Sequence, residues 1–389
     1  MKTLADLGDK ITGKRVLMRV DFNVPLDKKT FKITNDMRIR QALPTIRRAM
    51  EKGARVVLMS HLGRPDGKVV PDLSLDKVAK RLGELLGKPV KFVPECIGDK
   101  AKAAVDALKN GEALMLENLR FHPDEEKNCQ CFSEALASLG DYYVNDAFGT
   151  AHRAHASTEG VTKYLPSVAG FLIAKEVEYL SKATENPDHP FVAVMGGAKV
   201  SDKIDVIRNL MKKADALLVG GAMAYTFLKQ QGVAVGKSKV EDDKLGLAGE
   251  LLQQYGKKIV LPVDHVVAAE ISEGARAQVV EGKIPDGMIG LDIGPKTAKM
   301  YEERIARAKL VVWNGPMGYS EIKTFADGTR RIAQAMANSK AITIVGGGET
   351  AEAVEALGLQ DKISHVSTGG GASLEFLGGK VLPGIAVLK

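Results

Sequence analysis

Short runs of apolar and β-branched residues alternate with longer amphipathic helical patterns along nearly the whole chain. Buried strands that are each followed by a crossover helix produce this alternation, so it predicts parallel sheets. The chain has 389 residues, and at about 150 residues per domain this length predicts two or three domains. We therefore predict an α/β fold with two doubly wound, Rossmann-like domains.

The strand candidates fall into two series, which a continuous helical pattern at 171–183 and a turn-rich breaker at 186–190 separate. We predict a first domain over 1–170, a connecting helix over 171–185 and a second domain over 186–374. The expected strands are 15–20, 54–59, 113–116 and 142–144 in the first domain, and 191–195, 216–219, 259–262, 310–313 and 341–345 in the second. Further helices are expected at 37–52, 75–86, 203–213 and 350–357.

The composition is that of an ordinary globular protein, with 45% apolar and 26% charged residues, and this excludes disorder. The longest nearly apolar run, 214–228, is shorter than the ~20 residues that a bilayer span needs. Acidic residues interrupt the N-terminus before a secretory signal could form. Three cysteines are too few for a disulfide framework. We expect a cytoplasmic protein without a membrane partner.

Positive charge is concentrated in the first domain. Residues 1–170 hold 28 basic and 22 acidic side chains, against 27 and 26 in residues 171–389. Such an excess attracts nucleic acid, a membrane surface or a small anionic substrate. The basic residues are spread singly and aromatic residues are only 5%, which argues against nucleic acid.

Basic residues follow every expected strand of the first domain. Ligands of open parallel sheets bind beyond the carboxyl ends of the strands, and arginine forms forked hydrogen bonds with carboxylate and phosphate. One such arginine alone indicates a solvated surface charge, but four strand ends with arginine predict a site for a small polyanion. The residues at these ends include Arg19, Asp21, Phe22, Asn23, His61, Leu62, Gly63, Arg64, Arg120, His152, Arg153 and His155.

Glycines follow the strands of the second domain, at 196–197, 220–221, 315 and 346–348. Glycine between a strand and a helix lets backbone N–H groups approach a phosphate at the positive helix end. A single Gly-Gly pair indicates only a tight turn. Four such turns on one sheet, with Lys199 and Lys203 one helical turn apart, predict a nucleotide site.

The two neighbouring thiols, Cys129 and Cys131, have no second cysteine pair. His122 does not complete a usual zinc spacing with them. The pattern therefore favours a surface thiol pair over a zinc site.

Ordered motifs along essentially the whole chain resemble the phosphoglycerate kinase family. They are RVDFNVP at 19–25, HLGRP at 61–65, LENLRFH at 116–122, NDAFGTAHRAH at 145–155, GGAKVSDK at 196–203, WNGPMG at 313–318, GGGETA at 346–351 and STGGGA at 367–372. The family transfers the acyl phosphate of 1,3-bisphosphoglycerate to MgADP, giving 3-phosphoglycerate and MgATP, and is typically monomeric. The resemblance implies two domains that face each other across a hinged cleft, with the tail 375–389 returning to the first domain.

The resemblance also implies roles for individual residues. Arg38 and Lys199 would clamp the transferred phosphoryl group, with N–H donors from Gly370 and Gly371. The phosphoglycerate would lie against Asp21, Phe22, Asn23, Arg38, His61, Leu62, Gly63, Arg64, Arg120 and Arg153. The nucleotide would lie against Lys203, Glu321, Gly347, Gly348, Glu349 and Thr350, with Glu349 on Mg²⁺.

Two positions depart from the family pattern. Glu349 stands where the family usually has Asp at the magnesium position; it keeps the charge but adds a methylene. The segment 318–321, Gly-Tyr-Ser-Glu, replaces the usual Gly-Val-Phe-Glu, so the assignment of Glu321 to the ribose rests on alignment alone.

An acyl phosphate is already activated, so the reaction needs in-line positioning and charge neutralisation and no covalent nucleophile. Hinge closure about 171–183 and the Gly369 region is expected to unite the substrates and exclude water.

Two alternatives stay open on the sequence. A nicotinamide-dependent dehydrogenase would need Gly-x-Gly-x-x-Gly after a strand, a spacing that the glycine turns do not supply. A non-catalytic binding protein would have a broken active constellation, but Arg38, Lys199 and Lys203 are all present.

Overall fold

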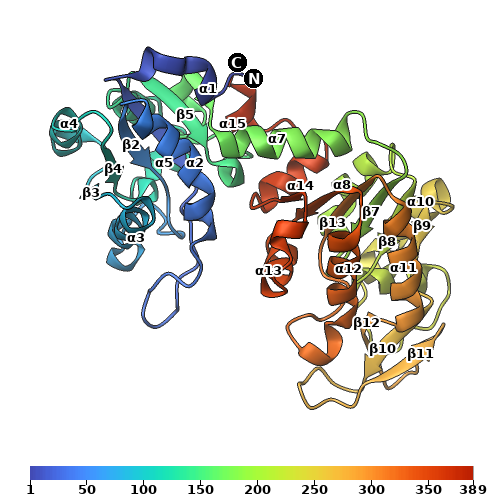
Figure 1. Ribbon diagram of the computed structural model, residues 1–389. Helices are drawn as coiled ribbons and strands as arrows, with labels where there is room; N and C mark the ends of the chain where they lie inside the picture. The colour runs from blue at the N-terminus through green and yellow to red at the C-terminus, as the bar shows by residue number, and fades with distance from the viewer. Residues whose placement is uncertain (389) are drawn as a thin grey trace. The chain divides into compact units, whose positions relative to one another are not determined.

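The computed structural model describes residues 1–388, which form two compact units. The first unit comprises Met1–Val177 and the tail from Val381 onward, and the second comprises Glu178–Lys380. The boundary falls inside helix α7 (Phe171–Thr184), which corresponds to the expected connecting helix. Both units have the predicted α/β architecture (Figure 1).

The first unit is built on a six-stranded parallel sheet of order β3-β4-β2-β1-β5-β6. The central strand β1 is buried along almost its whole length, as a strand covered on both faces must be. Strands β2, β3 and β4 lie on one side of β1, and β5 and β6 lie on the other, so the sheet has a topological switch point there, where ligands bind in such folds. The strands are β1 (Arg15–Val20), β2 (Arg55–Met59), β3 (Val90–Val93), β4 (Ala113–Leu116), β5 (Tyr142–Asp146) and β6 (Ser167–Ala169).

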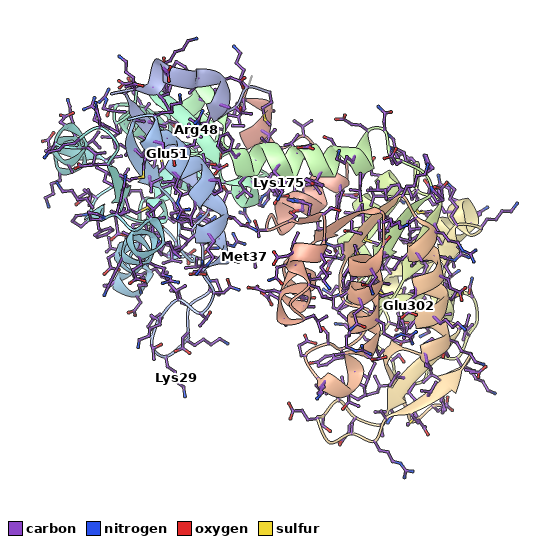
Figure 2. All side chains as sticks on the ribbon, in the orientation of Figure 1. Lys29, Met37, Arg48, Glu51, Lys175 and Glu302 are labelled. Carbon is purple, nitrogen blue, oxygen red and sulfur yellow. The ribbon has the colours of Figure 1, made fainter. Side chains whose placement is uncertain are left out.

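Helices flank this sheet and bury their apolar sides in one core. The 15-residue α2 contributes Ile39, Leu43 and Ile46 to that core, next to β1 side chains such as Val16 and Met18. In Figure 2, Met37 and Glu51 mark the two ends of α2. The helices of this unit are α1 (Leu4–Leu7), α2 (Met37–Glu51), α3 (Asp76–Leu86), α4 (Gly98–Asp106), α5 (Pro123–Glu126), α6 (Gln130–Ala137) and α15 (Pro383–Ala386).

The second unit repeats the architecture, with a parallel sheet of order β15-β14-β13-β7-β8-β9 and a switch point between β7 and β13. Trp313 is fully buried at the end of β13, as expected of a core residue. The strands are β7 (Phe191–Met195), β8 (Ala216–Val219), β9 (Ile259–Val260), β13 (Leu310–Asn314), β14 (Ile342–Gly346) and β15 (His365–Val366). The helices are α8 (Ile204–Leu210), α9 (Met223–Gln230), α10 (Leu245–Tyr255), α11 (Pro295–Arg307), α12 (Asp327–Asn338), α13 (Gly348–Ala356) and α14 (Gly371–Leu377).

A separate three-stranded antiparallel sheet of the second unit was not predicted. It consists of β10 (Asp264–Ala268), β11 (Gln278–Glu281) and β12 (Ile289–Ile293) in the order β11-β10-β12. Its edge strand β11 is largely exposed, so it lacks the apolar run that marks the buried strands.

The structure differs from the sequence prediction in three further places. The edge strands β6 and β15 were missed because they are short, and β3 was missed because it is only partly buried. The predicted helix 203–213 begins only at Ile204, and Lys199 lies in the preceding loop, so the two lysines do not lie one turn apart on a helix. The tail that joins the first unit is shorter than predicted and starts at Val381. Its helix α15 (red in Figure 1) is held by Gly384, whose N–H donates to the Ala151 carbonyl at 2.9 Å.

No helix formed by residues 1–388 combines the length and the apolar character that crossing a membrane requires.

Candidate active site

A buried arginine stands at the carboxyl end of β1, the switch point of the first sheet. Arg19 Nε donates to Ser157 Oγ at 2.9 Å, and Arg19 Nη2 lies 3.2 Å from His61 Nδ1. The Ser157 hydroxyl donates onward to the buried Glu125 carboxylate at 2.5 Å. Arg19 Nη1 donates to the Val20 carbonyl, so all three guanidinium nitrogens have partners and the buried group keeps one orientation with a fixed positive charge.

Three further arginines, Arg38, Arg120 and Arg153, place positive charge near the two histidines at this end of the sheet. Burial lowers the pKa of His61 well below its ordinary value, and the positive charges of Arg19, Arg120 and Arg38 lower it further. The pKa of His155 falls to about 4, again through burial first and then through Arg19, Arg120 and Arg153. Both imidazoles are therefore neutral at pH 7. The arginines alone supply the positive charge of this cluster, which is what binding a small polyanion requires.

The surroundings of Arg120 disfavour the charged form of its guanidinium. Burial lowers the pKa of its guanidinium, and Arg19 and Arg153 lower it further, whereas Glu126 at 3.3 Å opposes this. Its Nη1 donates to the Gly63 carbonyl at 3.0 Å, and its buried Nε faces Glu126 Oε1 at 3.3 Å without making a hydrogen bond. A bound anion beside this guanidinium would offset the repulsion from the neighbouring arginines.

Arg38 lies in the first turn of α2, one residue after the labelled Met37 in Figure 2. A cation is disfavoured there by the helix macrodipole, so its position suggests a role other than helix stability. Its Nη1 pairs with the buried Asp21 carboxylate. Gly149, after β5, is required for this arrangement, because a Cβ there would lie 2.3 Å from Asp21 Oδ2.

Other predicted residues shape the loops at this edge of the sheet. Asn23 Oδ1 accepts from the Gly63 N–H at 2.8 Å, which joins the loops after β1 and β2. The buried Phe22 donates its N–H to Ser60 Oγ at 2.9 Å. Leu62 is buried as well, whereas Arg64 and Arg153 are exposed to solvent.

Sequence reasoning counted Arg19 as the arginine of the first strand end but gave it no individual role, and it did not assign Asn118, Glu125 or Ser157. Asn118 receives the N–H groups of Leu62 at 3.2 Å and Arg120 at 3.1 Å, so it couples the loops after β2 and β4. Arg19 carried a signal, because a charged residue inside an otherwise apolar buried strand is unusual.

In the second unit, three of the glycine turns pack directly against one another. The Gly196 N–H donates to the Asn314 carbonyl at 2.9 Å, and the Gly221 N–H donates to the Met317 carbonyl at 2.7 Å. A Cβ on Gly315 would lie 2.2 Å from the Gly196 carbonyl oxygen, and Gly315 also has φ +93°. These glycines are thus needed for close contact between loops, which is sufficient to explain them without a ligand.

The turn after β14 is different. Gly347 adopts φ +91° immediately before α13, and a Cβ on Gly348 would meet nothing within 4 Å. The open backbone at the start of this nine-residue helix suits an anionic ligand. Thr350 is buried and accepts the Gly315 N–H at 2.7 Å, so it fastens this helix to the loop after β13.

An open cavity lies beside these turns within the second unit. Apolar groups such as Leu291, Ile289 and Pro316 line most of it, and the carboxylates of Glu321 and Glu349 reach its wall. A largely apolar cavity with a few polar groups is the usual form of a site for a small organic ligand. The buried Asp264 accepts the Lys296 and Thr297 N–H groups at 2.9 and 2.8 Å and caps α11.

The two predicted lysines differ in environment. Lys203 is half-buried in a 3₁₀ turn (Ser201–Lys203) and donates to Asn314 Oδ1. Burial lowers the pKa of its ammonium group, and Glu349 partly opposes this. Lys199 is exposed. The preceding loop is anchored by Glu241, which accepts the Val200 N–H at 2.5 Å.

The residues expected to donate N–H groups to the phosphoryl lie at the start of α14. Gly370 adopts φ +52°, and the neighbouring Ser367 and Ser373 hydroxyls are 2.5 Å apart. Gly371 is exposed.

A divalent cation fits the residues present near α13. Mg²⁺ prefers hard oxygen ligands and usually takes only one or two carboxylates from a protein, with phosphates and water completing its shell. Glu349 offers an exposed carboxylate at the cavity wall in the first turn of α13, so it can serve as that ligand.

Comparison with known proteins gives one consistent result. A family model described as phosphoglycerate kinase matches residues 4–380. A phosphoglycerate kinase of Moorella thermoacetica is 58% identical over 390 residues, covering 99% of this chain and 98% of its own. The phosphoglycerate kinase of Dictyoglomus turgidum is 56% identical over 394 residues, covering 100% and 99%. Among solved structures, phosphoglycerate kinase from Coxiella burnetii has a TM-score of 0.89 at 45% identity, covering 99% of this chain and 98% of its own.

Proposed function

The chain belongs to the phosphoglycerate kinase family, and from this premise we propose that it transfers the acyl phosphate of 1,3-bisphosphoglycerate to MgADP. The products are 3-phosphoglycerate and MgATP, and the reaction is reversible and serves glycolysis and gluconeogenesis. The observation that carries this proposal is the cluster of four arginines around two neutral histidines at the switch point of the first sheet. Its substrates are small molecules. We also propose, from the family resemblance, that the protein is a cytoplasmic monomer and that its activity needs neither nucleic acid nor a membrane.

The first unit binds the phosphoglycerate in this proposal. Arg19, to which sequence reasoning gave no individual role, fixes the interior of the arginine cluster, and Arg120 contributes a largely buried guanidinium beside it. Asp21 and Asn23 orient the loops, and the exposed Arg64 and Arg153 complete the positive rim. The high charge density selects a ligand with both a carboxylate and a phosphate over a monoanion.

The second unit binds the nucleotide. Its cavity accepts the base and ribose, with Glu321 as the hydroxyl acceptor, while Gly347, Gly348 and Thr350 place the start of α13 at the phosphates. Lys203 adds a positive charge, and Glu349 holds Mg²⁺. The bound ion neutralises phosphate charge during transfer.

The transfer itself requires positioning more than acid–base chemistry. Arg38 and Lys199 neutralise the oxygens of the moving phosphoryl group, and Gly370 and Gly371 donate backbone N–H groups to it. Because donor and acceptor bind to different units, we propose that closure about 171–185 and the Gly369 region brings them in line and excludes water.

The test is acyl-phosphate formation from ATP and 3-phosphoglycerate, followed through a coupled dehydrogenase with and without Mg²⁺. Turnover that requires both substrates and Mg²⁺ is the expected result. Folded protein that binds 3-phosphoglycerate but shows no turnover would replace this proposal with a binding protein.

A further inference from the structure

Helix α5, the start of α6 and the turn between them bring together a group of metal-ligating side chains that the proposed reaction does not use. Cys129 and Cys131 offer thiol sulfurs and Asp124 offers a carboxylate oxygen, and these ligand atoms all lie within 4.8 Å of one another. Cys131 is exposed, and the other two residues are half-buried, so an ion from solvent can reach all three. Sequence reasoning favoured a surface thiol pair because it lacked a third ligand, and the fold supplies one.

The backbone fixes this arrangement before any ligand binds. Asn128 adopts φ +53°, and this left-handed residue turns the chain back so that the Cys129 N–H donates to the Asp124 carbonyl at 3.0 Å. Asn128 Nδ2 donates to Glu159 Oε2 at 2.5 Å, which anchors the turn. On the other side, Ser133 donates both its N–H and its hydroxyl to the Cys129 carbonyl, at 3.0 and 2.9 Å.

We propose that Cys129, Cys131 and Asp124 bind one thiophilic divalent cation of the Zn²⁺ or Cd²⁺ type. Two thiolates and one carboxylate occupy three positions, and water occupies the fourth. Binding releases the two thiol protons to solvent, and no electron is transferred. Thiolate ligands select such ions over Mg²⁺, which prefers oxygen, so the site is chemically distinct from the carboxylate at Glu349.

The distances suit this coordination. Ligands at about 2.3 Å from a tetrahedral centre lie about 3.8 Å apart. The present separations do not exceed 4.8 Å, so closing the shell requires movements of at most about 1 Å. Rotation of the exposed Cys131 and the half-buried Asp124 can supply this without moving the backbone.

A reversible disulfide between the two thiols is the competing use of this pair. A carboxylate beside them contributes nothing to a disulfide, whereas it supplies the third ligand of a cation site. The position of Asp124 therefore favours the cation. The third thiol, Cys96, is buried and provides a matched control.

The experiment titrates Cd²⁺ into the full-length, reduced, metal-free chain. It follows the ultraviolet charge-transfer absorption of cadmium thiolates, which ions bound at Glu349 do not produce. The wild type and Cys96→Ala are expected to saturate at one Cd²⁺ per chain, with up to two protons released. Cys129→Ser and Cys131→Ser should each lose about half of the absorption and at least ~100-fold in affinity. Asp124→Asn should keep the absorption and bind at least ~10-fold more weakly, by comparison with the 10–100-fold effect of outer-shell changes.

Three results would overturn the proposal. The first is a wild-type curve that persists in the Cys129→Ser/Cys131→Ser double variant. The second is saturation at one ion per two chains, which would place the ion between molecules. The third is a reduced chain that ignores Cd²⁺ but whose pair closes on treatment with a thiol oxidant, which would establish the disulfide instead. Circular dichroism of each metal-free variant excludes unfolding as the cause of lost binding.

Discussion

The two units share a six-stranded parallel sheet with a switch point, yet they place opposite kinds of residue at their strand ends. The first unit uses side chains: buried and half-buried arginines such as Arg19, Arg38 and Arg120 are fixed by hydrogen bonds. The second unit uses backbone: glycines bring its loops into contact and leave the start of α13 open. The same scaffold can thus bind an anion with rigid charge or with exposed N–H groups, and each solution fails under a different substitution.

The largest expected effect comes from Arg38→Ala, which removes one of the fixed arginines of the first unit. Because Arg38 is assigned to the transferred group, we expect kcat to fall about 10²–10³-fold, with a much smaller change in KM. Steady-state kinetics in the coupled assay measure both parameters. Arg40→Ala is the matched control, because Arg40 lies on the same helix, is exposed and pairs with Asp36. Turnover that survives Arg38→Ala would refute this role and leave the reaction assignment standing.

The comparison also predicts that the binding of either ligand can be weakened without weakening the binding of the other. Arg120→Met should weaken 3-phosphoglycerate binding about 10–100-fold and leave MgADP binding unchanged, because it removes charge only in the first unit. Lys203→Met should do the reverse. Isothermal titration calorimetry of both ligands on both variants tests this. If either variant weakens both ligands equally, the two sites are not separate.

The sequence was sufficient for the parts of this comparison that depend on buried apolar runs. The expected strands at 15–20 and 191–195 match β1 and β7, since strands covered on both faces are mostly apolar segments. The antiparallel strand β11 was missed because most of its residues face solvent.

The site residues, too, could be predicted only where a local sequence pattern marks them. Arginines beyond the strand ends were found because each follows a strand. The contact from Arg19 to Ser157 was not, because it joins residues 138 positions apart. The glycine turns were interpreted as phosphate-binding, but only the structure separates those that pack, such as Gly315, from those that remain open, such as Gly348.

That separation can be tested by adding one methyl group. Gly315→Ala forces a Cβ at φ +93° into the Gly196 carbonyl, so we expect a loss of at least about 2 kcal/mol in the free energy of unfolding. Gly348→Ala adds its Cβ to open space and should change stability by less than about 0.5 kcal/mol. Urea denaturation measures both. Equal losses in the free energy of unfolding would mean that both glycines are needed for packing.

The effect that is spread over the widest range of conditions concerns a carboxyl that each unit buries at the start of a helix. Asp146 accepts the Leu172 N–H at 2.8 Å at the start of α7, and Asp292 accepts the Gly328 N–H at 2.7 Å in the first turn of α12. Burial raises the pKa of each carboxyl to about 7, from an ordinary value of 3.8, although these N–H groups oppose the shift. Between pH 4 and 7 the folded chain therefore holds protons that the unfolded chain has released.

Stability contributed by these protons is complete below pH 4 and is lost as the pH rises to 7. Each group should lower the free energy of unfolding by roughly 1 kcal/mol per pH unit in this window. Asp146→Asn should reduce the dependence of the free energy of unfolding on pH by that amount, as measured by urea denaturation at pH 5, 6 and 7. Asp141→Asn is the control: hydrogen bonding to Arg15 lowers the pKa of Asp141, so its contribution is lost only as the pH falls below about 4. If Asp146→Asn leaves the slope unchanged, Asp146 is ionised in the folded chain, and the α7 N–H groups outweigh its burial.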